Sequence, residues 1–312
     1  MRVKSPTALE VALTVAVATA DITSRIINHR GYWRFCSILA GFFANSQERL
    51  TVSADDFAFQ FPLNDSYWLR LLGSGYTYEP ELAYLLYFLR AQRYVFLDCG
   101  ANLGYWSARV CSAAYGSQRA IAIEADERNY HGLVENSTLN GSRFQTMHRA
   151  LWGRSGVRMN LFGDADYPTD FSLLSNDGNK PVRGTVETIC LDDIVLSEEE
   201  AKLPVVIKLD VEGVEGEAMG GAQRILSGDS IVLYEDHGAD RTHASTRWFF
   251  EHGGFTIWAI TERGLFEVTQ LSDLDRLKVS LTRGYNFAAA HVDSTWHERL
   301  QAVVVASPGH VR

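Results

Sequence analysis

The fold is decided by one stretch, which reads Tyr94-Val95-Phe96-Leu97-Asp98-Cys99-Gly100-Ala101-Asn102-Leu103-Gly104-Tyr105-Trp106. Its first four residues form a continuous apolar run, which is typical of a strand buried on both faces of a parallel sheet. Asp98 ends the run, and Gly100 and Gly104 permit a sharp turn and a close approach of the backbone to a ligand. Small and apolar residues over positions 105–115 then predict a helix. This order predicts a cofactor site at the carboxyl edge of a doubly wound sheet.

The glycine turn differs from the dinucleotide-binding fingerprint. That fingerprint is G-x-G-x-x-G, whereas here an acid, Asp98, is followed by glycines at positions 100 and 104. A carboxylate repels phosphates but attracts an ammonium group. The turn therefore suits a nucleoside that carries a cationic amino acid, which describes S-adenosylmethionine. Two alternatives are a plain tight turn and a nicotinamide-dependent oxidoreductase on a similar sheet, and the missing third glycine counts against the oxidoreductase.

Three further apolar strands also end at an acid: they end at Glu124, Asp210 and Glu235. Because the carboxyl ends of parallel strands meet at one edge of a sheet, we expect these side chains to face the same site as Asp98. Glu124 lies a little beyond the roughly 20-residue separation at which an acid reaches ribose hydroxyls, so we predict that it binds the ribose. The alternative is a surface carboxylate at the end of a strand.

Strands and helices alternate from residue 79 onward, which predicts an α/β domain over residues 79–312 with a mostly parallel sheet and helices on both faces. Residues 1–78 predict an extension, with two helices over about 8–44 broken near Gly31 and a hairpin of residues 50–53 and 57–61. A third core strand is expected over 144–151, and Ala150 near its end would border an adenine-sized slot. The alternation breaks over 152–202, where short strand-like runs over 157–162 and 185–190 flank a polar stretch over 163–184. This polar stretch predicts an insertion that serves as a binding loop or lid.

The composition is that of a globular protein, with 46% hydrophobic and 21% charged residues. The net charge of −9, from 29 basic and 38 acidic residues, argues against a nucleic-acid partner. Four scattered cysteines without a C-x-x-C pair indicate reduced thiols in a cytoplasmic protein and no zinc site. Residues 11–20 resemble part of an export signal, but Glu10 interrupts the apolar run and the segment is too short to span a membrane. We therefore expect a packed helix there and no transmembrane segment; no feature indicates an oligomeric state.

With these residues assembled, the chain resembles the FkbM family of S-adenosylmethionine-dependent methyltransferases. The resemblance covers roughly residues 79–238, and its most specific part is the string Lys208-Leu209-Asp210-Val211-Glu212-Gly213-Val214-Glu215-Gly216. One departure is Ala125, where the family usually has proline. The other matching segments are 97–105, 122–124 with Asn136 and Asn140, 149–151, 191–193, and Glu235 with His237.

The resemblance implies a Rossmann-like class I methyltransferase sheet and O-methylation of a hydroxyl on a small molecule, a sugar or glycan, or a secondary metabolite. It implies a methyl donor held by a set of residues at the first strand ends, and the adenine slot adds Ala150: Asp98, Gly100, Asn102, Gly104, Glu124 and Ala150.

Methyl transfer to a hydroxyl requires alignment of the reactants, exclusion of water and removal of a proton. The candidates for proton removal are Asp210, Glu212, Glu235 and His237, and Lys208 is expected to offset the clustered negative charge. For each of these side chains the alternative is a structural hydrogen bond or a helix cap. A divalent cation held by Asp210, Glu212 and Glu235 is a second possibility, but the spacing does not require it and we predict a metal-free site. We further predict that Asp210→Asn and His237→Ala lose turnover while still binding the donor.

Overall fold

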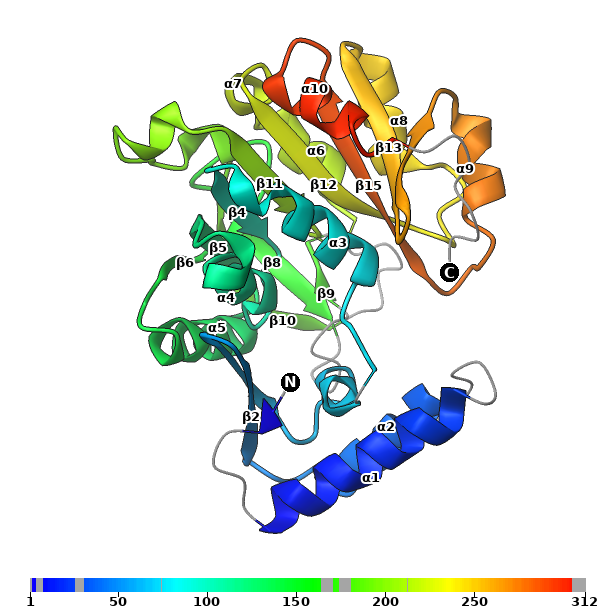
Figure 1. The fold of residues 1–312 in the computed structure, drawn as a ribbon. Helices are drawn as coiled ribbons and strands as arrows, with labels where there is room; N and C mark the ends of the chain where they lie inside the picture. Colours follow the sequence, from blue (N-terminus) through cyan, green and yellow to red (C-terminus); the bar gives the residue numbers. More distant parts are fainter. Residues whose placement is uncertain are drawn as a thin grey trace.

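The computed structural model describes residues 2–3, 8–25, 31–73, 75–163, 171–173, 181–211 and 213–304. An eight-stranded sheet forms the centre of the molecule (Figure 1). Its strands, in spatial order, are β14 (Gly264–Val268), β13 (Phe255–Thr261), β15 (Gly284–His291), β12 (Ser230–His237), β11 (Val205–Leu209), β4 (Val95–Cys99), β5 (Arg119–Glu124) and β6 (Phe144–His148). The strands from β12 to β6 pair in parallel, and β15 lies antiparallel between β12 and β13. The predicted mostly parallel α/β sheet is confirmed.

Both faces of the sheet are buried, which explains the continuous apolar runs of its central strands. Alternate residues of each strand enter two separate hydrophobic clusters, so that Phe96 packs on one face and Val95 and Leu97 on the other. The first face is covered by α3 (Pro80–Phe88), α4 (Tyr105–Val110), α5 (Glu127–Leu139) and α10 (Thr295–Gln301). The second is covered by α6 (Glu215–Gly220), α7 (Gln223–Leu226), α8 (Ala244–His252) and α9 (Leu271–Leu277).

The N-terminal residues form a helix pair and a small sheet, as expected. The helices α1 (Ala8–Arg25) and α2 (Tyr32–Gly41) lie side by side at the bottom of Figure 1. The predicted hairpin is present as β2 (Arg49–Ala54) and β3 (Phe57–Pro62), and the sequence reading missed the short strand β1 (Arg2–Val3) that pairs with β2. A 3-10 helix, η1 (Trp68–Leu72), then leads towards α3.

Asn136 of α5 and Asn140, which follows this helix, hold the edge of the hairpin. The side-chain amide of Asn136 accepts from the backbone N–H of Gln60 at 2.7 Å and donates to its carbonyl at 2.9 Å. Asn140 forms the same pair of bonds with Ala58. Each amide therefore replaces a neighbouring strand for one residue of β3, and both buried backbone groups are satisfied.

The expected third core strand is wrong in its extent, because it divides at Arg149 into two strands. Its second part, β7 (Ala150–Leu151), leaves the main sheet and pairs with β10 (Val182–Ile189). With β8 (Arg158–Gly163) and β9 (Phe171–Ser172) these strands form a second sheet of order β7-β10-β8-β9. The strand-like runs expected over 157–162 and 185–190 are confirmed as β8 and β10, while residues 164–170 and 174–180 of the polar stretch lie outside the described part.

One helix is shorter than predicted: the helix expected over 105–115 ends at Val110. Asp126 caps α5, since its side chain accepts from the Asn129 N–H. In the part of the chain that the structure describes, no helix is long and apolar enough to cross a membrane.

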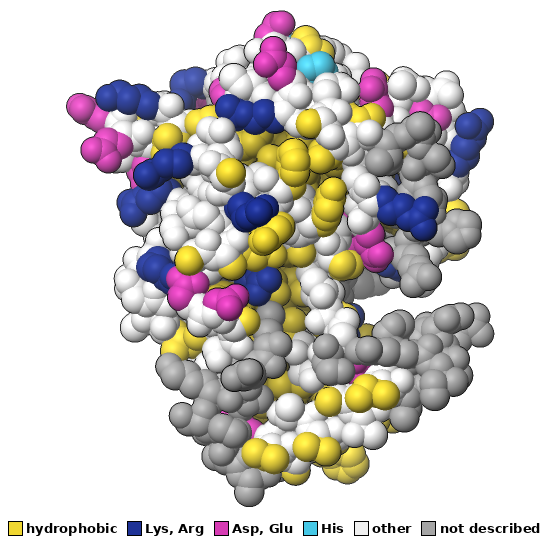
Figure 2. Space-filling model, in the orientation of Figure 1, with side chains coloured by type: hydrophobic (Ala, Val, Ile, Leu, Met, Phe, Trp, Pro, Cys, Tyr) yellow, Lys and Arg dark blue, Asp and Glu magenta, His cyan; other side chains and the backbone are white. Residues whose placement is uncertain are grey.

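Hydrophobic side chains also gather on the outer side of α1 and α2, at the bottom of Figure 2. Val11, Val15 and Ile22 of α1 are exposed. Ile38 of α2 and Phe42, which follows α2, are exposed as well. Their spacing is that of a helix stripe that faces away from the core.

Candidate active site

A cavity of about 340 Å³ opens at the carboxyl edge of the main sheet, where the sequence analysis expects the cofactor. Strand ends form its floor, η1 and the segment before α3 form one wall, and the second sheet contributes another. The described residues that line it and bear on the chemistry are Tyr67, Trp68, Tyr78, Glu79, Asp98, Gly100, Asn102, Tyr105, Trp106, Glu124, Arg149, Ala150, Lys208, Asp210, Glu235 and His237.

The glycine turn joins β4 to β11 as well as lining the cavity. Gly100 has a φ of 79°, and a Cβ added to it would lie 1.8 Å from the backbone oxygen of Asp210. Only glycine fits that contact. Gly104 has a different role: it precedes α4 with a φ of 82°, a Cβ there would meet Leu133 at 2.5 Å, and it does not line the cavity.

Asp98 is buried beneath the turn and ties it to α4. Its Oδ2 accepts from the backbone N–H of Ser107 at 3.0 Å and from the Ser107 hydroxyl at 2.7 Å. Burial raises the pKa of Asp98, and the Lys208 ammonium and the two bonds from Ser107 oppose that rise. One carboxylate oxygen is thus committed to the fold, while the side chain still borders the cavity.

Glu124 is fixed by two backbone donors. Its Oε2 accepts from the N–H of Asn102 at 2.7 Å, and its Oε1 accepts from that of Asp126 at 2.8 Å. Burial raises the pKa of Glu124 to about 8 despite these bonds. Asn102 itself has a φ of 52°, and its Oδ1 accepts from the Leu103 N–H and the Trp68 indole. The two residues lock the turn against β5.

Lys208 and Asp210 form an ion pair at the end of β11. The Lys208 Nζ lies 2.8 Å from Asp210 Oδ2, and the lysine is buried while the aspartate side chain is 30% exposed. Burial alone would lower the pKa of Lys208, but Asp210, Glu79 and Asp98 around it raise the pKa above its usual range. The lysine therefore remains charged, and it offsets the acids around it as predicted from its place in the sequence.

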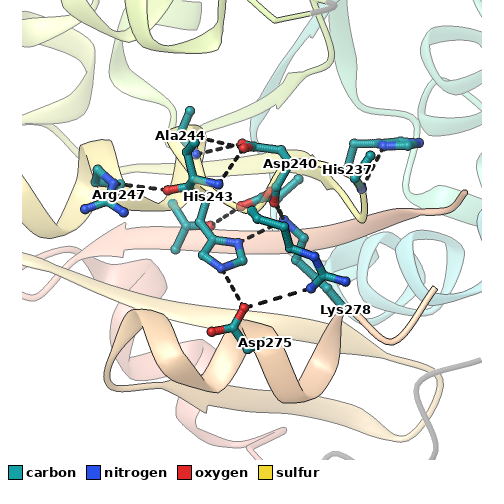
Figure 3. Close-up of polar contacts among 12 residues, drawn as sticks. His237, Asp240, His243, Ala244, Arg247, Asp275 and Lys278 are labelled. Atoms are coloured by element: carbon teal, nitrogen blue, oxygen red, sulfur yellow. Dashed lines mark hydrogen bonds and ion pairs between the residues drawn. The ribbon is translucent and has the colours of Figure 1, made fainter. Parts of the chain in front are cut away.

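The end of β12 delivers Glu235 and His237 to the cavity. The Glu235 carboxyl packs on β15, because a Cβ at Gly284 would lie 2.0 Å from its carboxyl carbon. The His237 ring is exposed, and its Nδ1 accepts from the Ala239 N–H at 3.1 Å. In Figure 3 this ring lies apart from the neighbouring polar network.

That polar network holds the loop that follows β12. The buried Lys278 binds Asp236 of β12, the backbone oxygen of Asp240 and the ring of His243, whose other nitrogen lies 3.3 Å from Asp275 (Figure 3). Because Asp236 lies between Glu235 and His237, the network fixes the strand end that carries both cavity residues.

Sequence reasoning missed the aromatic wall of the cavity. Tyr78 contacts four other rings with centroid distances between 4.9 and 6.0 Å: those of Tyr67, Trp68, Tyr105 and Trp106. Only Tyr105 and Trp106 belong to the glycine-turn stretch, and the others come from the N-terminal extension and the segment before α3. Glu79 was also missed as a cavity residue, because its place before Pro80 reads as a simple helix start.

The structure therefore brings most of the predicted site residues together around one cavity. Gly104 does not line it, and Glu212 lies outside the described residues. Within the described ranges, no group of three or more His, Cys, Asp or Glu side chains is placed to hold a metal ion.

The chain is similar in sequence to known methyltransferases. The family described as the methyltransferase FkbM domain matches residues 98–257, about half of the chain and the part that carries the strand ends of the cavity. The hexuronic acid methyltransferase AglP of Haloferax volcanii is 29% identical over 147 residues, which cover 46% of this chain and 56% of that protein. The match thus spans little more than half the length of this relative.

Solved structures that resemble the chain include a methyltransferase FkbM from Methylobacillus flagellatus KT, with 15% identity, a TM-score of 0.41 and coverage of 81% of this chain and 58% of that one. Another is M. jannaschii TYW2 in complex with AdoMet, with 11% identity, a TM-score of 0.41 and coverage of 78% and 84%. The family match over residues 98–257 shows that the chain belongs to the FkbM family of methyltransferases.

Proposed function

We propose that the protein transfers the methyl group of S-adenosylmethionine to a hydroxyl of a sugar, a glycan or a secondary metabolite. The observation that carries the proposal is the order of polar groups along the cavity floor. Glu124 of β5, Asp98 of β4, Asp210 at the end of β11 and Glu235 of β12 follow one another in the spatial order of their strands, and Ala150 lies beyond Glu124, after β6. At about 4.8 Å per strand, this row is long enough for a nucleoside at one end and an acceptor at the other.

The charges of the cavity fit the donor. The described lining residues include five acids, namely Glu79, Asp98, Glu124, Asp210 and Glu235, and two permanently basic side chains, Lys208 and Arg149. A ligand with a sulfonium and an ammonium group offsets this excess of negative charge, whereas a dinucleotide with a pyrophosphate would add to it. Glu124 would accept hydrogen bonds from the ribose hydroxyls, and Ala150 and Leu151 would border the adenine.

The chain's own residues then orient the acceptor and exclude water. S-adenosylmethionine supplies, when bound, a methyl group on a positively charged sulfur. Asp210, held by Lys208, and His237 stand at the far end of the floor, where they would bind the hydroxyls of the acceptor. The rings of Tyr67, Trp68 and Tyr78 offer an apolar wall against which the face of a sugar ring packs, and they keep bulk water from the reacting atoms.

The relative from Haloferax volcanii is called a hexuronic acid methyltransferase, which supports a sugar acceptor for this chain. The test is incubation of the protein with S-adenosylmethionine labelled in its methyl group and a panel of monosaccharides, uronic acids, glycolipids and host metabolites. We expect label in a sugar product as an alkali-stable methyl ether. Alkali-labile label would mean a methyl ester, and failure to label any hydroxyl of the panel would contradict the proposal.

The variants Asp210→Asn and His237→Ala test the acceptor end of the site. We expect both to bind the donor as the wild type does and to lose turnover. Full activity of both variants on the true acceptor would refute these assignments.

A further inference from the structure

We propose that Glu79 is the general base of the transfer and takes the proton of the acceptor hydroxyl. This inference rests on the proposed function and assigns a role to a residue from outside the matched family region of residues 98–257. Four observations support it: the position of the Glu79 carboxylate, the backbone conformation at Glu79, the hydrogen bonds of the side chain and the charges around it.

Glu79 lies at the acceptor end of the cavity. It lines the same cavity as Glu124, but the charged groups that act on it are Lys208 of β11, Asp210 just after this strand, and Glu81 of α3. None of these belongs to the adenosine end of the floor. A base placed here faces the region between the donor's methyl group and the hydroxyl-binding side chains of β11 and β12.

The backbone at Glu79 is strained, and the side chain does not serve the helix that follows it. Its φ of 41° and ψ of 67° lie in the left-handed region, although it is not a glycine and precedes Pro80, a position that favours extended backbone. An acid just before a helix normally caps it, but the Glu79 side chain makes no cap hydrogen bond to α3. The conformation instead directs the carboxylate into the cavity.

One oxygen of the carboxylate is fixed and the other is available. The indole N–H of Trp106, in the helix that follows the glycine turn, donates to Glu79 Oε2. Among the described residues, no hydrogen-bond donor to Glu79 Oε1 is found. The side chain is thus oriented by one bond while one oxygen remains to accept a proton.

The charges around Glu79 suit a general base. Burial raises the pKa of Glu79 to about 7, while the Lys208 ammonium limits that rise. A general base is most effective when its pKa lies near the working pH. Of the earlier candidates, Asp210 is engaged by Lys208 at 2.8 Å, and the His237 ring is exposed and accepts from the Ala239 N–H, so both are better suited to binding the acceptor than to removing its proton.

The step balances without a further reactant. The acceptor oxygen forms a bond to the methyl carbon as the carbon–sulfur bond breaks, and the electron pair of that bond stays on sulfur as a neutral thioether. The proton of the hydroxyl moves to Glu79, which then releases it to solvent.

The first measurement is independent of turnover. Calorimetric titration with S-adenosylmethionine at pH 6.5, in two buffers of different ionisation enthalpy, reports the protons released on binding. At this pH, below the pKa of about 7, Glu79 is partly protonated, and the donor's positive sulfur favours its ionised form, so we expect the wild type to release a fraction of a proton that Glu79→Gln does not release. Equal proton release by both proteins would overturn the inference.

The second measurement is transfer of labelled methyl groups by the wild type, Glu79→Gln, Glu79→Asp and a matched control, Glu81→Gln. Glu81 lies two residues later, in α3, where it accepts from the Asn286 side chain at 3.0 Å and does not line the large cavity. Glutamine keeps an oxygen for the Trp106 N–H, and thermal unfolding verifies that each variant is folded.

We expect Glu79→Gln to bind the donor within threefold of the wild type, to lose about 10²–10⁴-fold in rate and to lose the rise in rate towards pH 7. Glu79→Asp should recover part of the rate. Glu81→Gln should keep the wild-type rate at neutral pH, with the rise in rate shifted slightly to lower pH because one negative charge near Glu79 is lost. An unchanged rate or pH profile in Glu79→Gln, or a loss of donor binding above tenfold, would overturn the inference. If the wild type itself labels no acceptor, the proposed function fails, and the proton-release measurement alone decides whether Glu79 is the titrating group beside the donor.

Discussion

At the scale of single residues, the glycine turn holds the sheet together and also shapes the site. Gly100 lets the ends of β4 and β11 touch, and Glu124 binds the backbone of the turn while it borders the cavity. We therefore expect substitutions in the turn to change both the stability of the fold and the affinity for the ligand.

A comparison of Gly100→Ala with Gly156→Ala separates two contributions to the loss of stability: the clash of the new Cβ with its neighbours and the strain of the backbone at positive φ. Both glycines have a φ near 77°, at 79° and 76°, but a Cβ at Gly156 meets nothing within 4 Å. We expect Gly156→Ala to cost roughly 1 kcal/mol in the free energy of unfolding, from strain alone, and Gly100→Ala to cost about 3 kcal/mol because the backbone must also move. Denaturant titration gives both values. Equal costs would show that the contact with Asp210 is not tight.

If Glu124 binds the ribose as proposed, donor binding depends on pH. Ribose hydroxyls would donate to the ionised carboxylate, so the donor would bind best when Glu124 has lost its proton, and burial raises the pKa of Glu124 to about 8. We expect the affinity for S-adenosylmethionine to rise between pH 6 and 8 and to level off above that range. Calorimetry in Glu79→Gln protein isolates this effect from Glu79. A flat affinity profile in that protein would contradict the ribose assignment.

At the scale of elements, the site depends on how the hairpin β2–β3 docks on α5. That docking carries the chain through η1 to the aromatic wall, and it relies on two buried side-chain amides rather than on a strand pair. Asn136 also donates to the backbone oxygen of Leu103, next to the glycine turn.

Asn136→Ala should therefore loosen both the hairpin and the turn. It leaves buried backbone groups of Gln60 and Leu103 without partners, and we expect a loss of about 3 kcal/mol in unfolding free energy with faster hydrogen exchange at the Gln60 amide. Thr138→Ala, on the exposed side of the same helix, is the control and should change stability by no more than about 0.5 kcal/mol. Similar behaviour of the two variants would show that the amide pairing does not hold the hairpin.

The elements also show which parts of the architecture are readable from sequence. Strands that end in acids are local patterns, so β4, β5, β11 and β12 and their edge residues follow from the sequence directly. The departure of β7 from the main sheet does not, because it requires pairing with β10 almost 40 residues later. The aromatic wall and Glu79 were missed for the same reason: their place in the cavity depends on docking between distant segments.

At the scale of the whole molecule, the extension and the catalytic sheet share one hydrophobic core. A single cluster runs from Leu13 and Val17 of α1 through Phe59 and Trp68 to Phe96 of the sheet. We therefore expect the chain to unfold in one cooperative transition.

Phe59→Ala tests this coupling. The Phe59 ring is fully buried and packs against Trp68 at 4.7 Å and Tyr105 at 5.3 Å, two residues of the cavity wall. We expect a loss of about 3–5 kcal/mol, a lower midpoint for the same single transition and weaker donor binding. Phe42→Ala, whose side chain is 80% exposed, should leave both unchanged. A separate early transition in Phe59→Ala would show that the extension unfolds on its own.

The central claim is that the cavity at the carboxyl edge binds S-adenosylmethionine, and calorimetric titration tests it most directly. Wild-type protein at neutral pH is titrated with S-adenosylmethionine and, in a separate run, with NAD⁺. We predict one site per chain for S-adenosylmethionine, competition by S-adenosylhomocysteine and no heat of binding for NAD⁺. The absence of S-adenosylmethionine binding, or tighter binding of NAD⁺, would contradict the account.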